Sequence, residues 1–125
     1  MIGESPNSYA KDVWMSAKRS GGELVQGTLD LLILKALSQE PIHGWGIARS
    51  IELQSQAVLR IEEGSLYPAL RRLERDGFVN GKWAISENNR RARYYALTAR
   101  GRRRLQREHE RWRTVVRAMS LVLES

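Results

Sequence analysis

The hydrophobic pattern of the chain changes its period at Gly77. Before it, four apolar side chains recur at the three- and four-residue spacing of one helix face: Leu66, Ala69, Leu70 and Leu73. After it, the β-branched and aromatic runs FVNGKWAIS (78–86) and RARYYAL (91–97) flank a turn-rich ENNR, which is typical of a β-hairpin. Gly77 itself suits a helix C-terminal cap. A helix followed directly by a hairpin leaves few fold classes open.

Two further helices are expected upstream. Residues 28–39 combine an N-cap threonine, Thr28, with a stop at Pro41. Their apolar face is wide, because Leu31 and Leu34 extend it beyond a single stripe, and this predicts a subunit contact. One side of this helix should form the core: Leu29, Leu32, Ile33, Ala36 and Leu37.

Residues 43–55 predict a second helix, with Ile47, Ile51 and Trp45 as candidates for its inward face. The segment AVLRIEE that follows reads as a short linker or a strand, and the third helix begins at about residue 64 or 65. Two short helices, of which the second is rich in arginine, outline a helix-turn-helix. With the hairpin added, the expected fold is a winged helix-turn-helix: mainly α with a small β-hairpin, in the α+β class.

A last helix is expected from the N-cap Thr98 to about Leu123. At about 1.5 Å per residue it is longer than a small domain can cover, so its distal half requires a partner, and a second copy of the chain is the economical choice. Its apolar positions alternate by four and three residues, as in a heptad seam. These positions are the candidate dimer contacts: Leu105, His109, Trp112, Val116, Met119 and Leu123.

The length of 125 residues suits one compact domain with appendages. We expect an N-terminal extension at 1–26, either a short helix or disordered, a winged-helix domain at 27–97, and a dimerisation helix at 98–125.

The positive charge is concentrated in one region. Residues 60–117 hold 16 of the 21 Lys and Arg but 7 of the 14 acidic residues. All but one of these 16 cations are arginine, whose planar donors suit phosphates and guanine edges. An anionic polymer is therefore the expected partner, and a merely solubilising face is the alternative.

The third helix offers candidate DNA contacts on the side opposite its leucines. Ser65, Tyr67 and Pro68 are expected in its exposed first turn, because a proline is tolerated there. Arg71 and Arg75 lie one turn apart and would follow the groove, with Arg72 at the flank. Two alternatives stay open: arginines paired with Glu74 and Asp76, and a half-buried Tyr67. In the hairpin, Arg90, Arg91 and Arg93 are the candidate DNA contacts, which would lie along a groove or the backbone. The alternative is a hairpin tip that is merely solvated.

At this point the residues resemble a known family. GTLDLLILKAL, HGWGIA, EEGSLYPALRRLERDGFV and W.ISENNRRARYYALTARGRRRL, followed by E...W, are similar to the PadR family of bacterial transcriptional regulators, in its short form. The resemblance covers about residues 24–123. It implies a winged helix, a homodimer formed through the first and last helices, pseudo-palindromic operators in double-stranded DNA, and repression of adjacent genes that a small ligand releases.

The resemblance also implies roles for individual residues. Ser65, Tyr67, Pro68 and Arg71 fall on the recognition-helix motif, and the segment Asn88, Asn89, Arg90, Arg91 to Arg93 falls on the wing. Trp112, with Val116, lies where some drug-responsive relatives bind a hydrophobic effector between subunits; the alternative for Trp112 is a dimer core without ligand. For His109 two roles are open: a packed or solvent-bridged histidine, or a pH- or metal-sensitive switch.

Other function classes fit less well. The chain has no cysteine, two histidines and no phosphate-binding glycine loop, so we expect neither an enzyme nor a cofactor or metal site. No apolar stretch approaches the roughly 18 residues of a membrane span, and no secretory signal is visible, which predicts a cytoplasmic protein without membrane contact. The main alternative function is a non-specific or architectural nucleic-acid-binding protein; a protein-interaction module is the third.

Overall fold

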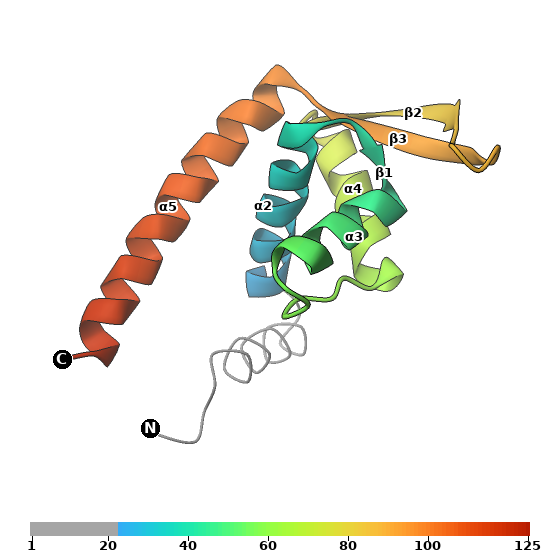
Figure 1. Ribbon diagram of the computed structural model, residues 1–125. Coiled ribbons are helices and arrows are strands. Elements are labelled where there is room, and N and C mark those ends of the chain that lie inside the picture. Colours follow the sequence, from blue (N-terminus) through green and yellow to red (C-terminus); the bar gives the residue numbers. More distant parts are fainter. Residues whose placement is uncertain (1–22) are drawn as a thin grey trace.

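Three helices and a small sheet surround one apolar core in the described part of the chain, residues 23–125 of a computed structural model (Figure 1). The hairpin and the last helix extend from this body in opposite directions. The elements follow in the order α2 (Glu23–Gln39), β1 (Ile42–His43), α3 (Gly44–Gln54), α4 (Glu63–Arg75), β2 (Val79–Ile85), β3 (Arg91–Leu97) and α5 (Ala99–Leu123). The predicted extension lies outside the described residues as far as residue 22, whereas residues 23–26 already belong to α2.

The core consists of side chains from every element except β1 and α5, with Phe78 added from the turn before β2. Leu34, only 1% exposed, fills this core. The expectation that Leu34 contacts a second subunit is therefore wrong, because its side chain is enclosed by its own chain; Leu31 is half-buried. The buried set is Leu29, Ile33, Leu34, Ala36, Leu37, Ile47, Ile51, Leu66, Ala69, Leu70, Leu73, Phe78, Val79 and Tyr95.

The helix α2 begins five residues earlier than expected. Thr28, predicted as its N-cap, lies inside the helix and follows Gly27. A Gly-Thr pair is typical of a helix start, but local propensity is a weak prior that the surrounding structure overrides. The predicted end at Gln39 is correct.

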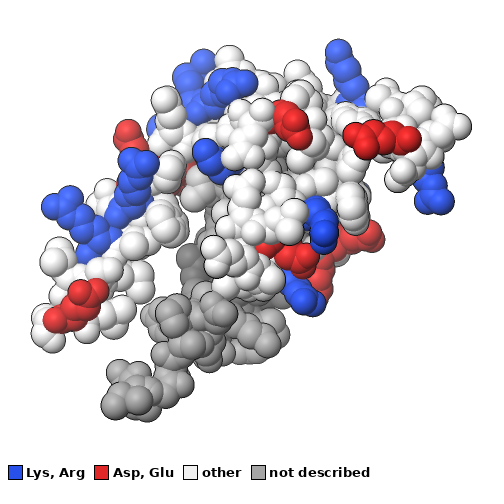
Figure 2. Space-filling view, viewed as in Figure 1, with Lys and Arg blue, Asp and Glu red and all other residues white. Residues whose placement is uncertain are grey.

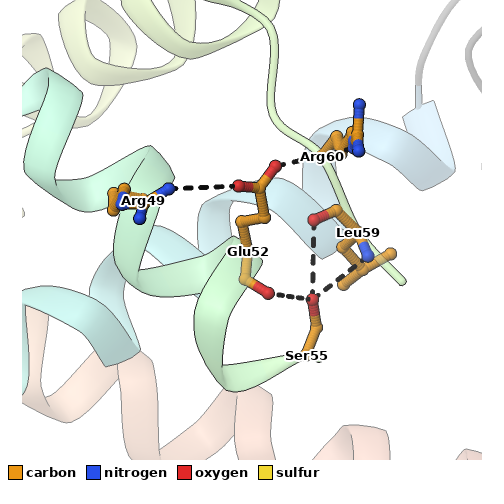
Figure 3. Close-up of polar contacts among 5 residues, drawn as sticks. All are labelled: Arg49, Glu52, Ser55, Leu59 and Arg60. Atoms are coloured by element: carbon orange, nitrogen blue, oxygen red, sulfur yellow. Dashed lines mark hydrogen bonds and ion pairs between the residues drawn. The ribbon is translucent and has the colours of Figure 1, made fainter. Parts of the chain in front are cut away.

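Between α3 and α4 the chain makes a tight turn that side chains hold in place (Figure 3). The Ser55 hydroxyl accepts the backbone N–H of Leu59 at 3.1 Å and donates to the Glu52 carbonyl at 3.2 Å. The carboxylate of Glu52 lies between Arg49 and Arg60, 3.7 and 3.6 Å from their nearest nitrogens. The linker is therefore a turn rather than the strand that was the alternative.

The helix α3 begins where His43 caps it, with Nδ1 accepting the N–H of Gly46 at 3.0 Å. Ile47 and Ile51 face the core as predicted. Trp45 does not: it is 66% exposed, because it lies two residues before Ile47 and therefore on the opposite side of the helix.

The helix α4 carries Pro68 in its second turn, not in its first as expected, because the helix already begins at Glu63. The proline removes the N–H that would bond to the Gly64 carbonyl, and since Gly64 is exposed, solvent reaches this turn. The helix ends as predicted just before Gly77, which has a φ of +81°, a backbone conformation that favours glycine. The N–H groups of Gly77 and Phe78 bond back to Glu74 and Leu73, a Schellman motif.

The sheet is antiparallel, in the order β1-β3-β2. The predicted hairpin is present, and Asn89 in its turn has a φ of +59°, the left-handed conformation expected for an asparagine. The two-residue strand β1, which pairs Ile42 with Tyr95 and His43 with Tyr94, was not predicted, since two residues give no alternating pattern.

The start of α5 is fixed against the turn before β2. The Thr98 hydroxyl donates to the Gly77 carbonyl at 2.7 Å and accepts the N–H of Gly101 at 3.0 Å, so the predicted N-cap is correct. Gly101 is buried, and a Cβ there would lie 2.1 Å from the Phe78 carbonyl oxygen. Arg100 and Arg104 both place their guanidinium groups over the Phe78 ring. This junction sets the direction in which α5, the arm of the molecule, extends from the body (Figure 1).

Candidate nucleic-acid interface

The outward side of α4 is polar and basic. Its leucines are in the core, so that Pro68, Arg71 and Arg75 are exposed on the opposite side, as the helical period predicts. These three residues line a shallow groove with Arg72 and Glu74. Arg75 keeps 70% of its side chain in solvent, although its Nε lies 3.1 Å from the Asp76 carboxylate. Arg71 and Arg75 therefore present two positive charges one helical turn apart.

Arg72 has a different environment. Its guanidinium donates to the Asp30 carboxylate of α2 at 2.9 Å, and the two side chains are mostly buried. Burial raises the pKa of Asp30, an effect that the charges of Arg72 and Arg104 oppose. For Arg72, predicted to contact DNA from the flank of α4, the structure shows a charge that is paired with Asp30 and holds α4 on α2.

Arg93 is likewise paired. It donates to the carboxylate of Glu74 on α4, and its guanidinium lies 5.8 Å from the Trp83 ring centre. The alternative of a merely solvated side chain is wrong for Arg93, and its predicted availability to DNA is reduced, because α4 supplies a carboxylate beside this part of β3. The alternative that arginines of α4 pair with its own acids holds for Arg75 with Asp76, but not for Glu74, whose partner Arg93 belongs to the hairpin.

Ser65 and Tyr67 lie on the two flanks of α4. Ser65 is half-buried, and Tyr67 is 36% exposed with its ring where a side chain on Gly44 would be. Tyr67 thus contributes both to packing and to the surface, so neither reading of this residue is complete alone.

The hairpin, which we call the wing, ends in an exposed tip. Asn88, Asn89, Arg90 and Arg91 are all solvent-exposed. The Arg91 guanidinium stacks on Trp83, 4.9 Å from the ring centre. A groove of about 790 Å³ separates the wing from the start of α3, and Tyr67 and Trp45 lie on its wall. The wing and the outward side of α4 are thus neighbouring basic surfaces.

Sequence reasoning missed several residues at this surface. Trp83 was noted only as part of an aromatic run, although its position two residues before Ile85 placed both on one strand face. Asp30 and Glu74 were not recognised as partners of specific arginines. No local spacing signals such pairs, because they join α2 to α4 and α4 to β3.

Eight of the 15 arginines in the basic region at residues 60–117 belong to α5 rather than to α4 or the wing. In Figure 2 the basic side chains are distributed along this arm. The helix carries eight: Arg100, Arg102, Arg103, Arg104, Arg107, Arg111, Arg113 and Arg117.

The distal apolar positions of α5 are open to solvent in the single chain. Trp112, Val116, Met119 and Leu123 are exposed, with Trp112 at 50%, whereas Leu105 packs against the core and His109 is half-buried. The predicted seam therefore lies on one side of the helix, and four of its six positions are exposed in the described residues.

A comparison with protein families matches residues 33–107, more than half of the chain, to the transcriptional regulator PadR-like family. The chain belongs to the PadR-like family. Its members are DNA-binding transcriptional regulators, so the predicted family and the winged-helix class are confirmed.

Solved structures agree with this assignment. A PadR family transcriptional regulator from Eggerthella lenta is 30% identical, with a TM-score of 0.70 over 94% of this chain and 98% of that one. A transcriptional regulator from Clostridium thermocellum is 26% identical, with a TM-score of 0.70 over 78% and 95% of the two chains. A 37.1 kDa protein in a Streptomyces fradiae transposon is 41% identical over 78 residues, which are 62% of this chain and 21% of that protein.

Within residues 23–125 of this PadR-like regulator, no helix is both long and apolar enough to span a bilayer.

Proposed function

We propose that this PadR-like chain is a dimeric repressor that binds a pseudo-palindromic operator in double-stranded DNA and controls adjacent genes. The observation that supports the proposal is the presence of two exposed basic surfaces on one domain. One is the outward side of α4 with Arg71 and Arg75, and the other is the wing tip with Arg90 and Arg91. A recognition helix in the major groove with a wing beside it requires this arrangement.

Within the proposed contact, residues 27–97 bind DNA. The Ser65 hydroxyl, Tyr67 and Pro68 meet the DNA near the N-terminal half of α4, and Arg71 reads a base edge, since arginine is suited to guanine. Arg75, Arg90 and Arg91 neutralise phosphates, with Asn88 and Asn89 at the wing tip. Arg72 and Arg93 act indirectly, by holding α4 on α2 and the wing on α4.

The dimer is proposed to form through residues 98–125 with a contribution from Leu31. The exposed apolar side chains of α5 support it, since a contiguous apolar surface of this kind is typical of an interface. A second copy would bury Trp112, Val116, Met119 and Leu123, and two-fold symmetry would set the two α4 helices against the two operator halves.

A small hydrophobic ligand is proposed to release the repressor from DNA. Trp112 and Val116 would line its site between the subunits, where a planar apolar molecule could stack on the indole. No catalytic step is involved, and the action is placed in the cytoplasm, where a bacterial chromosome lies.

Selection of bound fragments from the genomic DNA of the source organism tests the proposal. A repressor of adjacent genes should enrich a two-fold symmetric sequence close to its own gene, with half-sites about one helical turn of DNA apart. Enrichment without a common sequence would instead identify the architectural alternative, which the arginines of α5 favour.

A further inference from the structure

Trp83 is an exposed tryptophan whose ring is in contact with two arginine side chains. It is 58% exposed on β2 and lies directly opposite Arg93 on β3. Arg91, two residues before Arg93 in β3, lies on the same face of the sheet. The guanidinium carbons of Arg91 and Arg93 lie 4.9 and 5.8 Å from the ring centre. Exposing an indole to water is unfavourable, so a role for this ring has to be sought in what it holds.

The two arginines are held differently. Arg93 is bound to Glu74 of α4, which ties the middle of the wing to the recognition helix. Arg91 is exposed, and among the described residues its guanidinium has no carboxylate within ion-pair distance. The charge of Arg93 is therefore already neutralised, whereas that of Arg91 is available to a ligand.

The contacts form one continuous series from α4 to the wing surface: Glu74, Arg93, Trp83 and Arg91, which we call the wing array. A long arginine side chain loses considerable rotamer entropy when it is fixed by a ligand. Stacking on Trp83 restricts Arg91 before any ligand arrives and leaves the edge of its guanidinium accessible. The attachment of Arg93 to Glu74 fixes where this edge lies relative to α4.

We propose that Trp83 is a positioning residue for DNA binding, which holds the guanidinium of Arg91 ready for a backbone phosphate beside the groove that α4 enters. The inference rests on the proposed function and adds to it a residue that does not itself need to touch DNA. A phosphate is favoured over a base edge because Arg91 lies on the wing, beside the helix that enters the groove, where cations meet the DNA backbone. Its planar pair of donors can bind two phosphate oxygens.

A double-mutant cycle on operator DNA tests the array, with Trp83→Leu, Arg91→Ala and the combination. Trp83→Leu should weaken operator binding about 2- to 5-fold, the range expected for an exposed cation–π contact. In the Arg91→Ala background the same change should have less than about a twofold effect, because nothing remains to be positioned. Trp83→Phe keeps an aromatic ring and should restore most of the affinity.

The ionic-strength dependence identifies the ligand of Arg91. Arg91→Ala should reduce the slope of log affinity against log salt by about 0.9, the value for one phosphate contact in duplex DNA. Lys82→Ala is the control, because Lys82 is an exposed cation of the neighbouring strand β2 and, next to Trp83 in that strand, its side chain points to the other face of the sheet. It should leave the slope closer to that of the unaltered protein.

Independent, additive losses from Trp83→Leu and Arg91→Ala would overturn the positioning role while leaving the proposed function intact. An unchanged salt slope with an altered base preference in Arg91→Ala would overturn the phosphate assignment. Failure of the unaltered chain to prefer its operator over random DNA would overturn the proposed function as well, so the two failures are distinguishable.

Discussion

Arg72 of α4 donates to Asp30 of α2 at 2.9 Å, whereas its neighbour Arg71 points into solvent from the outward side of the same helix. Two consecutive arginines therefore have different roles: Arg72 holds the recognition helix on the body, and Arg71 is available to DNA. This division gives a pair of variants with the same change in charge and different expected effects.

Arg71→Ala should weaken operator binding by about 1–3 kcal/mol if the contact to guanine is bidentate, and relax the preference at one or two bases. Its effect on the free energy of unfolding should stay within about 0.5 kcal/mol, because the side chain is on the surface. Arg72→Ala should instead lower the free energy of unfolding by about 1–3 kcal/mol, since Asp30 loses its partner in a partly desolvated site. Operator titration and urea unfolding of both variants measure these effects. Equal losses of affinity without loss of stability would contradict the division.

The stability of the protein should depend on pH through Asp30. Burial raises the pKa of Asp30 above its ordinary value of 3.8, although Arg72 and Arg104 act in the opposite direction. The folded protein then binds this proton more readily than the unfolded chain, so the contribution of Asp30 to stability is fully present below pH 3.8 and is lost as the pH rises through the raised pKa. The free energy of unfolding relative to Asp30→Asn should therefore decrease with increasing pH. Urea unfolding of both proteins at a series of pH values checks this; an increase would mean that the attraction of Arg72 outweighs burial.

The junction between the body and α5 should tolerate no side chain at Gly101. A Cβ there would lie 2.1 Å from the Phe78 carbonyl oxygen, a backbone atom that moves only with the turn before β2. Gly101→Ala should lower the free energy of unfolding by about 1–3 kcal/mol despite the better helix propensity of alanine. Gly27→Ala is the control, because among the described residues no atom beyond its chain neighbours and its own helix backbone lies within 4 Å of the added methyl group. It should be neutral or stabilising by up to about 1 kcal/mol. Equal stability of the two variants would show that the junction is looser than described.

The proposed dimer should depend on the apolar side of α5. Val116→Asp places a charge on that side and should shift sedimentation from dimer to monomer. Trp112→Ala should weaken the dimer by loss of buried area. Thr114→Asp, on the opposite side of the same helix, is the matched control and should leave the dimer intact. A dimer that persists in Val116→Asp would mean that the seam has been misassigned.

The elements with strong periodicity could be predicted from the sequence alone. The leucines of α4, the hairpin and the N-cap of α5 are each encoded within a few residues, so local reasoning found them. The beginning of α2 and the place of Pro68 were misjudged, because Gly27, Thr28 and Pro68 resemble helix-start signals while the neighbouring structure continues the helix.

The candidate site was predictable as a surface but not as a set of pairings. Spacing on α4 correctly separated Arg71 from the leucines, yet it placed Arg72 among the groove contacts. The partners of Arg72 and Arg93 come from α2 and α4, 42 and 19 residues away in the sequence. Only the packed fold brings such charges together, and it thereby decides which arginines remain available.

The central claim, that the outward side of α4 and the wing recognise one DNA sequence, is tested most directly by a ratio of affinities. The unaltered protein is titrated against the selected genomic sequence and against random duplex of equal length at one fixed, near-physiological salt concentration. We expect the selected sequence to bind at least on the order of a thousandfold more tightly than the random duplex. Affinities that agree within about tenfold, falling together as salt is raised, would contradict it and indicate an architectural binder.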